Sequence, residues 1–171
     1  MSLFATDRLR LRDLAPEDAP FILELLNEPA FIQNIADKGV RTLDDARGYL
    51  LDGPMASYAL HGFGLFAVEL KESGIPVGIC GLIKREGLED VDIGFAFLER
   101  HWSKGYAVEA AAATLDYGFG ALGLKRIVAI TAPDNQSSSR VLERIGMRFE
   151  GMIELPHYGG ANRLFALDAQ A

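Results

Sequence analysis

Residues 92–107 have the types and the order expected of a site for a phosphate group. They read as an apolar strand, a short polar loop and the start of an alanine-rich helix. Backbone N–H groups at a helix start have no partner within the helix, and the helix dipole favours an anion beside them. Gly105 lets the backbone approach a bulky ligand closely, while Ser103 and Lys104 add a hydroxyl donor and a positive charge. The segment therefore predicts a cradle for a phosphate or pyrophosphate group.

The loop alone leaves two interpretations open, because many strand-to-helix turns contain Gly and Lys without binding anything. It is not the nucleotide P-loop, since no Gly-Lys-Ser/Thr follows a Gly-x-x-x-x spacing. The three-glycine pattern of dinucleotide-binding turns is also absent. A domain that uses this loop for ADP or NAD stays open as an alternative.

Two separate motifs resemble those of GNAT acetyltransferases. Residues 100–110 are similar to the pyrophosphate loop of that superfamily, Arg/Gln-x-x-Gly-x-Gly/Ala. Residues 135–147 resemble its second coenzyme A motif, Asn-x-x-Ser-x-x-x-Leu-x-x-x-Gly-Phe, and residues 6–12 resemble its opening strand. The wording Trp-Ser-Lys-Gly-Tyr-Ala-x-Glu-Ala is particularly like the ribosomal-protein alanine/serine N-acetyltransferase (RimJ/RimL-like) branch. The resemblance covers nearly the whole chain, in order.

This resemblance implies acetyl-CoA as the acetyl donor, lying between two strands that splay apart, residues 92–98 and 127–132. Asn135 is expected to bond the pantetheine amide or the approaching amine. The resemblance implies that the pantetheine arm is held by the backbone of Phe95, Ala96 and Phe97. It implies that the pyrophosphate is held by the loop residues Arg100, His101, Trp102, Ser103, Lys104, Gly105, Tyr106 and Ala107.

The implied reaction is direct attack of a neutral amine on a thioester, which needs a proton acceptor, an oxyanion donor and an acid for the leaving thiolate. Asp92 resembles the family position that often carries a Glu base, and its shorter side chain favours a water relay. A backbone N–H near Phe95 is expected to stabilise the oxyanion, and Ser138 to protonate the thiolate. The alternative interpretation is that Asp92 solvates a strand end and Ser138 caps a helix.

Three residues depart from the family pattern. Ser103 stands where the loop usually has its first glycine, and we expect it to keep ordinary dihedral angles and still present its N–H group. Met147 replaces the usual Phe, and Leu142 stands where many GNAT enzymes place a tyrosine acid. That acid is therefore expected to be missing.

The composition and charge of the chain limit the kinds of partner that it is expected to bind. The 171 residues carry a formal charge of -7 with a pI near 4.9, which disfavours nucleic acid and anionic membranes as partners. Cys80 is the one cysteine, so no intrachain disulfide forms, and a buried structural role is favoured over a nucleophile. The histidines show no metal-ligand spacing, so no metal is expected, and His157 is a candidate for the wall of an acceptor pocket. No leader peptide or membrane span is evident, which favours the cytoplasm.

The elements that position these residues predict an α+β fold, with a mixed, mostly antiparallel sheet of about seven strands and about four helices in one domain, 1–171. Strands are expected at 8–14, 64–70, 76–84, 91–98, 127–132, 147–153 and 163–167. Helices are expected from 15 until Pro29 stops the first one, at 42–51 until Gly53-Pro54 interrupts, and at 106–119 and 137–145. One parallel crossover, from 91 to 132, should be right-handed.

The acceptor is not fixed by these patterns. A protein N-terminus, a small amine or an antibiotic would each fit, as monomer or homodimer. A second class of function is an acyl-CoA sensor that binds without turnover.

Overall fold

A mixed eight-stranded sheet forms the centre of the computed structural model, which describes residues 2–156 and 158–170. The strands in those residues are β1 (Ser2–Ala5), β2 (Leu9–Asp13), β3 (Leu65–Leu70), β4 (Pro76–Ile83), β5 (Val91–Phe97), β6 (Arg126–Thr131), β7 (Arg148–Leu155) and β8 (Tyr158–Asp168). Their order across the sheet is β1-β2-β3-β4-β5-β6-β8-β7. Neighbouring strands are antiparallel except β5 and β6, which are parallel. The predicted α+β class with a mostly antiparallel sheet is confirmed.

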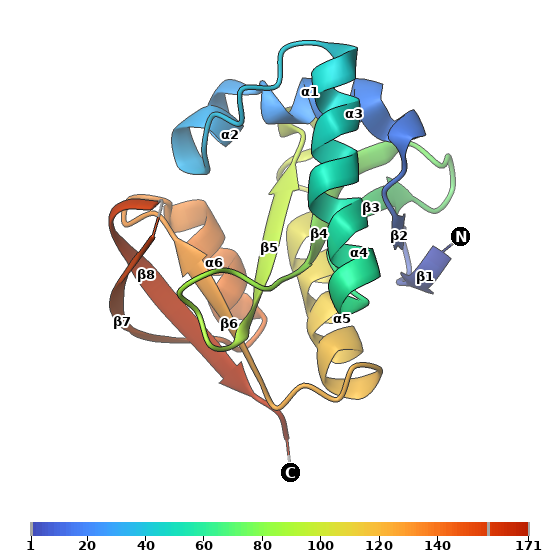
Figure 1. Cartoon of the computed structure of the whole chain (residues 1–171). Helices are drawn as coiled ribbons and strands as arrows, with labels where there is room; N and C mark the ends of the chain where they lie inside the picture. The colour runs from blue at the N-terminus through green and yellow to red at the C-terminus, as the bar shows by residue number, and fades with distance from the viewer. Residues whose placement is uncertain (1, 157, 171) are drawn as a thin grey trace.

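Helices cover both faces of this sheet (Figure 1). They are η1 (Pro16–Asp18), α1 (Ala19–Leu26), α2 (Pro29–Asn34), α3 (Leu43–Leu50), the π-helical turn η2 (Leu51–Met55), α4 (Ala56–His61), η3 (Glu99–His101), α5 (Tyr106–Gly120) and α6 (Gln136–Arg144). In Figure 1, α3 and α4 lie in front of the sheet and α5 lies behind it. The face behind packs on Ala111 and Leu115 of α5, and the other face packs on Ile22 of α1 and Leu50 of α3.

Helix α3 begins as its sequence predicts. The hydroxyl of Thr42 accepts from the N–H of Asp45 at 3.0 Å, and the carboxylate of Asp45 accepts from the N–H of Thr42 at 3.2 Å. This reciprocal capping satisfies two N–H groups that the helix itself leaves unpaired. It fixes the start of the longest helical stretch on that face.

Two prolines expected to limit helices lie within helices themselves, although the first helix does end before Pro29, at Leu26. Pro29 follows the end of α1 but is itself the first residue of α2, a position where the missing N–H costs nothing. Pro54 lies inside the wider turn η2, which joins α3 to α4 as one helical run, so Gly53-Pro54 does not end the helix. Strand β1 was also unexpected, and β8 is longer than predicted. No helix in the described part of the chain is long and apolar enough to cross a membrane.

Strands β5 and β6 diverge, and this separation shapes the site. They pair only at Val91 with Ile127 and at Asp92 with Val128. Figure 1 shows the two strands opening as a V from that paired end. The predicted splay of the two strands is confirmed. The N-termini of α5 and α6 follow the C-terminal ends of β5 and β6, so both helix starts belong to the open end.

Candidate active site

The loop before α5 presents a row of unpaired backbone donors. No acceptor in the described residues bonds the N–H groups of residues 103 to 108, and the first bond of the helix runs from the N–H of Glu109 to the carbonyl of Gly105 at 3.1 Å. Gly105 caps the helix with φ of +81°. Consecutive N–H groups at a helix start form a site for an anion, and the dipole of α5 adds to it.

Ser103 adopts a conformation that contradicts the expectation of ordinary dihedral angles. Its φ is +62°, the one positive φ at a non-glycine residue among those described. This left-handed region costs an L-residue about 1–2 kcal/mol. The backbone therefore keeps the shape that glycine favours, although the side chain is serine.

Residues of the turn between β1 and β2 hold this loop in place. Glu109, in the first turn of α5, accepts from the hydroxyl of Thr6, from the N–H of Arg8 at 3.1 Å and from Nε of Arg8 at 2.7 Å. Nη1 of Arg8 donates to the carbonyl of Lys104 at 2.8 Å, and its guanidinium lies 4.7 Å from the ring centroid of Tyr106. Arg8 therefore fixes the loop and brings a positive charge to it.

The other predicted loop side chains differ in where they point. The guanidinium of Arg100 pairs with Glu24 of α1, so its charge is directed to that helix. The indole N–H of Trp102 donates to the carbonyl of Phe97 at 2.8 Å, which packs the loop back onto β5. Burial, with the charges of Arg100 and Lys104, lowers the pKa of His101. Ala107 is half-buried in the first turn of α5.

The backbone of β5 alternates between its two neighbours. The N–H of Leu98 donates to Val77 of β4 at 2.9 Å, so Ala96, two residues earlier, also directs its backbone toward β4. Phe95 and Phe97 have the opposite parity and turn their N–H groups into the splay. Of the predicted backbone contacts, those of Phe95 and Phe97 face the opening, whereas the amide of Ala96 belongs to the sheet.

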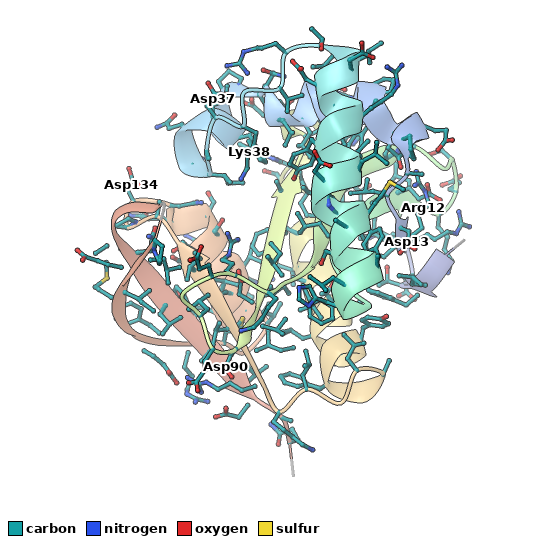
Figure 2. All side chains as sticks on the ribbon, in the orientation of Figure 1. Arg12, Asp13, Asp37, Lys38, Asp90 and Asp134 are labelled. Atoms are coloured by element: carbon teal, nitrogen blue, oxygen red, sulfur yellow. The ribbon has the colours of Figure 1, made fainter. Side chains whose placement is uncertain are left out.

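Asn135 and Ser138 lie at the start of α6. The side-chain oxygen of Asn135 accepts from the N–H of Ser138 at 3.2 Å, so Asn135 is the cap of this helix and Ser138 is not. Ser138 is half-buried in the first turn. Figure 2 shows Asp134, just before this cap, and Lys38, on the connection from α2 to α3, on the two sides of the open end.

Asp92 lies at the closed end of the splay and is fully buried. Nε of Arg85, on the connection from β4 to β5, contacts both carboxylate oxygens, at 3.0 and 2.9 Å. Burial raises the pKa of Asp92 to about 6, although the charge and hydrogen bond of Arg85 oppose this. The alternative that Asp92 merely solvates a strand end is wrong, because its side chain does not reach solvent.

The structure thus brings the loop residues 101–107 together at α5 and places Asn135 and Ser138 at α6, beside the same opening. Asp92 is at the other end of the V. Arg8, Glu109 and Arg85 were missed as site residues, although Arg8 and Glu109 both fall inside the quoted motifs. His157 lies outside the described residues.

Cys80 is structural, as favoured from the sequence. It is buried, and its Sγ lies 3.3 Å from the hydroxyl of Thr114 on α5. Burial raises the pKa of the thiol to about 12, so it stays protonated and unreactive at neutral pH.

Comparison with known proteins agrees with this geometry. Residues 8–148 match the family described as Acetyltransferase (GNAT) domain. The N-acetyltransferase YnaD of Bacillus subtilis, itself uncharacterised, is 32% identical over 149 residues, which are 87% of this chain and 84% of YnaD. A GNAT-family acetyltransferase structure from Bacillus anthracis is 33% identical with a TM-score of 0.81, covering 98% of each chain.

A more distant structure shares the fold. It is RimL, a ribosomal L7/L12 α-N-protein acetyltransferase in complex with coenzyme A, with a TM-score of 0.82, 16% identity and coverage of 99% of this chain and 98% of RimL. At that identity the likeness speaks for the fold alone. The match over most of the chain and the two closer relatives show that this chain belongs to the GNAT family and is an N-acetyltransferase that uses acetyl-CoA.

Proposed function

We propose that the N–H groups of residues 103 to 108 hold the diphosphate of acetyl-CoA. The observation that carries this proposal is the row of unpaired donors at the start of α5. A Cβ added at Gly105 would lie 3.3 Å from Nη2 of Arg8, so the glycine leaves room beside a cation. Lys104 and Arg8 supply charge that suits a diphosphate, and the N–H groups of Phe95 and Phe97 suit the amides of a pantetheine arm.

The chain's own residues then supply the proton transfers of the reaction. A neutral amine nitrogen forms a bond to the thioester carbonyl carbon, and the carbon–sulfur bond breaks. Asp92 takes the proton that the nitrogen loses, through a water molecule, and Ser138 gives a proton to the departing sulfur. The N–H of Phe95 stabilises the oxyanion. A pKa of about 6 leaves Asp92 largely ionised at pH 7, close to the value that suits a general base.

The acceptor we propose is a primary amine at the N-terminus of a protein or peptide, in the cytoplasm. The resemblance of residues 102–110 to the RimJ/RimL-like loop supports this choice. A small-molecule amine is the competing acceptor. Release of free thiol from acetyl-CoA, measured with a panel of peptides and small amines, separates the two, and binding without release for any amine would instead favour a sensor.

The diphosphate site is tested by Gly105→Asp. The added carboxylate should weaken coenzyme A binding by at least about 100-fold, because like charges about 4 Å apart near a surface repel by about 4 kcal/mol. Gly74→Asp is the matched control, since Gly74 also has a left-handed φ, +74°, in an open turn. Calorimetry should show normal affinity for the control. Normal affinity of Gly105→Asp for coenzyme A would show that the diphosphate does not bind at this loop.

A further inference from the structure

Asp92 and Arg85 form a buried pair with unequal exposure. The side chain of Asp92 is 1% exposed and that of Arg85 is 19% exposed. A carboxylate removed from water to this extent favours its neutral form unless a cation or several donors oppose it. Nε of Arg85 is the donor that reaches both oxygens of Asp92. The charge state of Asp92 therefore depends on this contact.

The surroundings contain few charged groups. Lys84 adds a weaker favourable charge, and its ammonium is held by the carbonyls of Leu88 and Glu89 at 2.6 and 2.7 Å. From the helical face come Lys38 and Tyr49. Burial and the charge of Arg85 lower the pKa of Lys38, while burial raises the pKa of Tyr49 against the opposing charge of Arg85. From β6, the residue beside Asp92 is the apolar Val128.

The position of Arg85 also restricts the orientation of the Asp92 carboxylate. It lies on the connection between β4 and β5, seven residues before Asp92, and reaches the carboxylate from the end of the strand pair. Because Nε lies within 3.0 Å of both carboxylate oxygens, the contact restricts how the carboxylate can turn at the paired end of β5 and β6. The contact thus controls both the charge and the orientation of Asp92.

We propose that Arg85 is a positioning residue that keeps the carboxylate of Asp92 ionised and oriented, so that it takes the proton of the acceptor amine near neutral pH. The proposal rests on the role of Asp92 as the base. In this role Arg85 acts through Asp92 rather than on a substrate. Its removal should change when Asp92 is ionised rather than abolish the reaction at every pH.

The test is the pH profile of kcat/KM for Arg85→Met, expressed relative to the unmodified protein at each pH so that ionisation of the amine cancels. The acid limb, expected near pH 6 in the unmodified protein, should move up by about one to three units when the cation is lost. A two-unit move lowers kcat/KM at pH 7 by about tenfold, with recovery by pH 9. Arg85→Lys should keep the limb close to its original position, and KM for acetyl-CoA should not change.

Arg47→Met is the matched control, because Arg47 is an exposed arginine of α3 that is ion-paired with the exposed Asp44. Its limb should not move. A folded Arg85→Met variant with an unmoved limb overturns the proposal. If Arg85→Met does not fold, the carboxyl carbon of Asp92 is titrated by NMR in the unmodified protein and in Arg85→Gln, and equal midpoints overturn it. Full activity of Asp92→Asn would instead refute Asp92 as base, which is a separate failure.

Discussion

Two buried carboxylates in this protein are paired with arginine and have opposite properties. Asp18, before α1, accepts from Nη1 and Nη2 of Arg12 and from the N–H of Ala15, each at 2.9 Å. Burial alone would raise the pKa of Asp18, but these hydrogen bonds outweigh it and the pKa is lowered. At Asp92, deeper burial outweighs the contact with Arg85 and a backbone hydrogen bond, and the pKa is raised. The depth of burial and the supply of donors together decide which effect wins.

The difference separates a structural pair from a chemical one. Arg12 also bonds Glu69 of β3 through Nε at 2.9 Å, so the cluster ties the start of the helical face to the sheet. Asp92 is left able to gain and lose a proton in the range where an enzyme works. A carboxylate with several donors stabilises the fold, whereas a more deeply buried one with fewer donors can change its protonation state near neutral pH.

The largest effect should come from removing the proposed base. Asp92→Asn should lower kcat by about 100-fold or more, because positioned general bases contribute about 10²–10⁴. Coenzyme A affinity should stay unchanged, since the proposed diphosphate site is at α5. Steady-state kinetics with calorimetry measure both quantities. A kcat within threefold of that of the unmodified protein would contradict a catalytic role for Asp92.

Removing the structural arginine should affect stability instead. Arg12→Met leaves Asp18 buried without its cation and leaves Glu69 with Arg10 as its remaining partner, which should lower the free energy of unfolding by about 3 kcal/mol or more. Urea unfolding followed by circular dichroism measures it. Arg47→Met, at an exposed pair, is the control and should lose less than about 1 kcal/mol. Equal losses in the two variants would contradict the structural role of the Arg12 cluster.

The two carboxylates should also respond to pH in separate windows. Asp18 has a lowered pKa when folded, so its contribution is present above the unfolded value of about 3.9 and is lost as pH falls below it. Asp92 has a raised pKa, so its contribution is full below about 3.9 and is lost as pH rises through about 6, a change of about 2–3 kcal/mol. Unfolding free energies from pH 3 to 8 would show the second window vanish in Asp92→Asn. If the loss of stability near pH 6 persisted in Asp92→Asn, another titrating group would be its cause.

The smallest expected effect is a difference in stability between the lysine variants of Arg12 and Arg85, whose contacts differ in geometry. Arg12→Lys loses the two-pronged contact with Asp18, which should cost about 1–2 kcal/mol of unfolding free energy. Arg85→Lys, where one nitrogen makes the contact with Asp92, should cost less. Thermal unfolding of both variants under identical conditions compares them. A larger loss for Arg85→Lys would reverse the order inferred from the contacts.

Periodicity in the sequence was enough to predict most of the fold. Helix α5 is predictable because it is long, alanine-rich and free of proline, and β5 because it is mostly apolar. Helix α2 has six residues and begins at a proline, so no local pattern distinguishes it from a turn. The run through η2 was missed because Gly53-Pro54 normally ends a helix and only packing makes the wider turn acceptable.

The site was predicted less completely, for a physical reason. The loop at α5 follows from local chemistry, because helix starts leave N–H groups unpaired wherever they occur. Where a long side chain points depends on what lies opposite in the folded chain. Arg100 turns to Glu24 of α1, and Arg85 turns to Asp92 across a connection whose path the sequence does not encode. The sign of the dihedral angle at Ser103 likewise follows from the loop's tertiary contacts.

The left-handed backbone at Ser103 has a consequence for the kinetics of acetyl-CoA binding. Its strained backbone is held by contacts formed during folding, among them the bond from Arg8 to the carbonyl of Lys104. The ring of amides is therefore preorganised in the free enzyme, and association with acetyl-CoA loses little loop entropy. Binding should proceed in one step, with an observed rate that rises linearly with donor concentration and shows no plateau from a slow rearrangement.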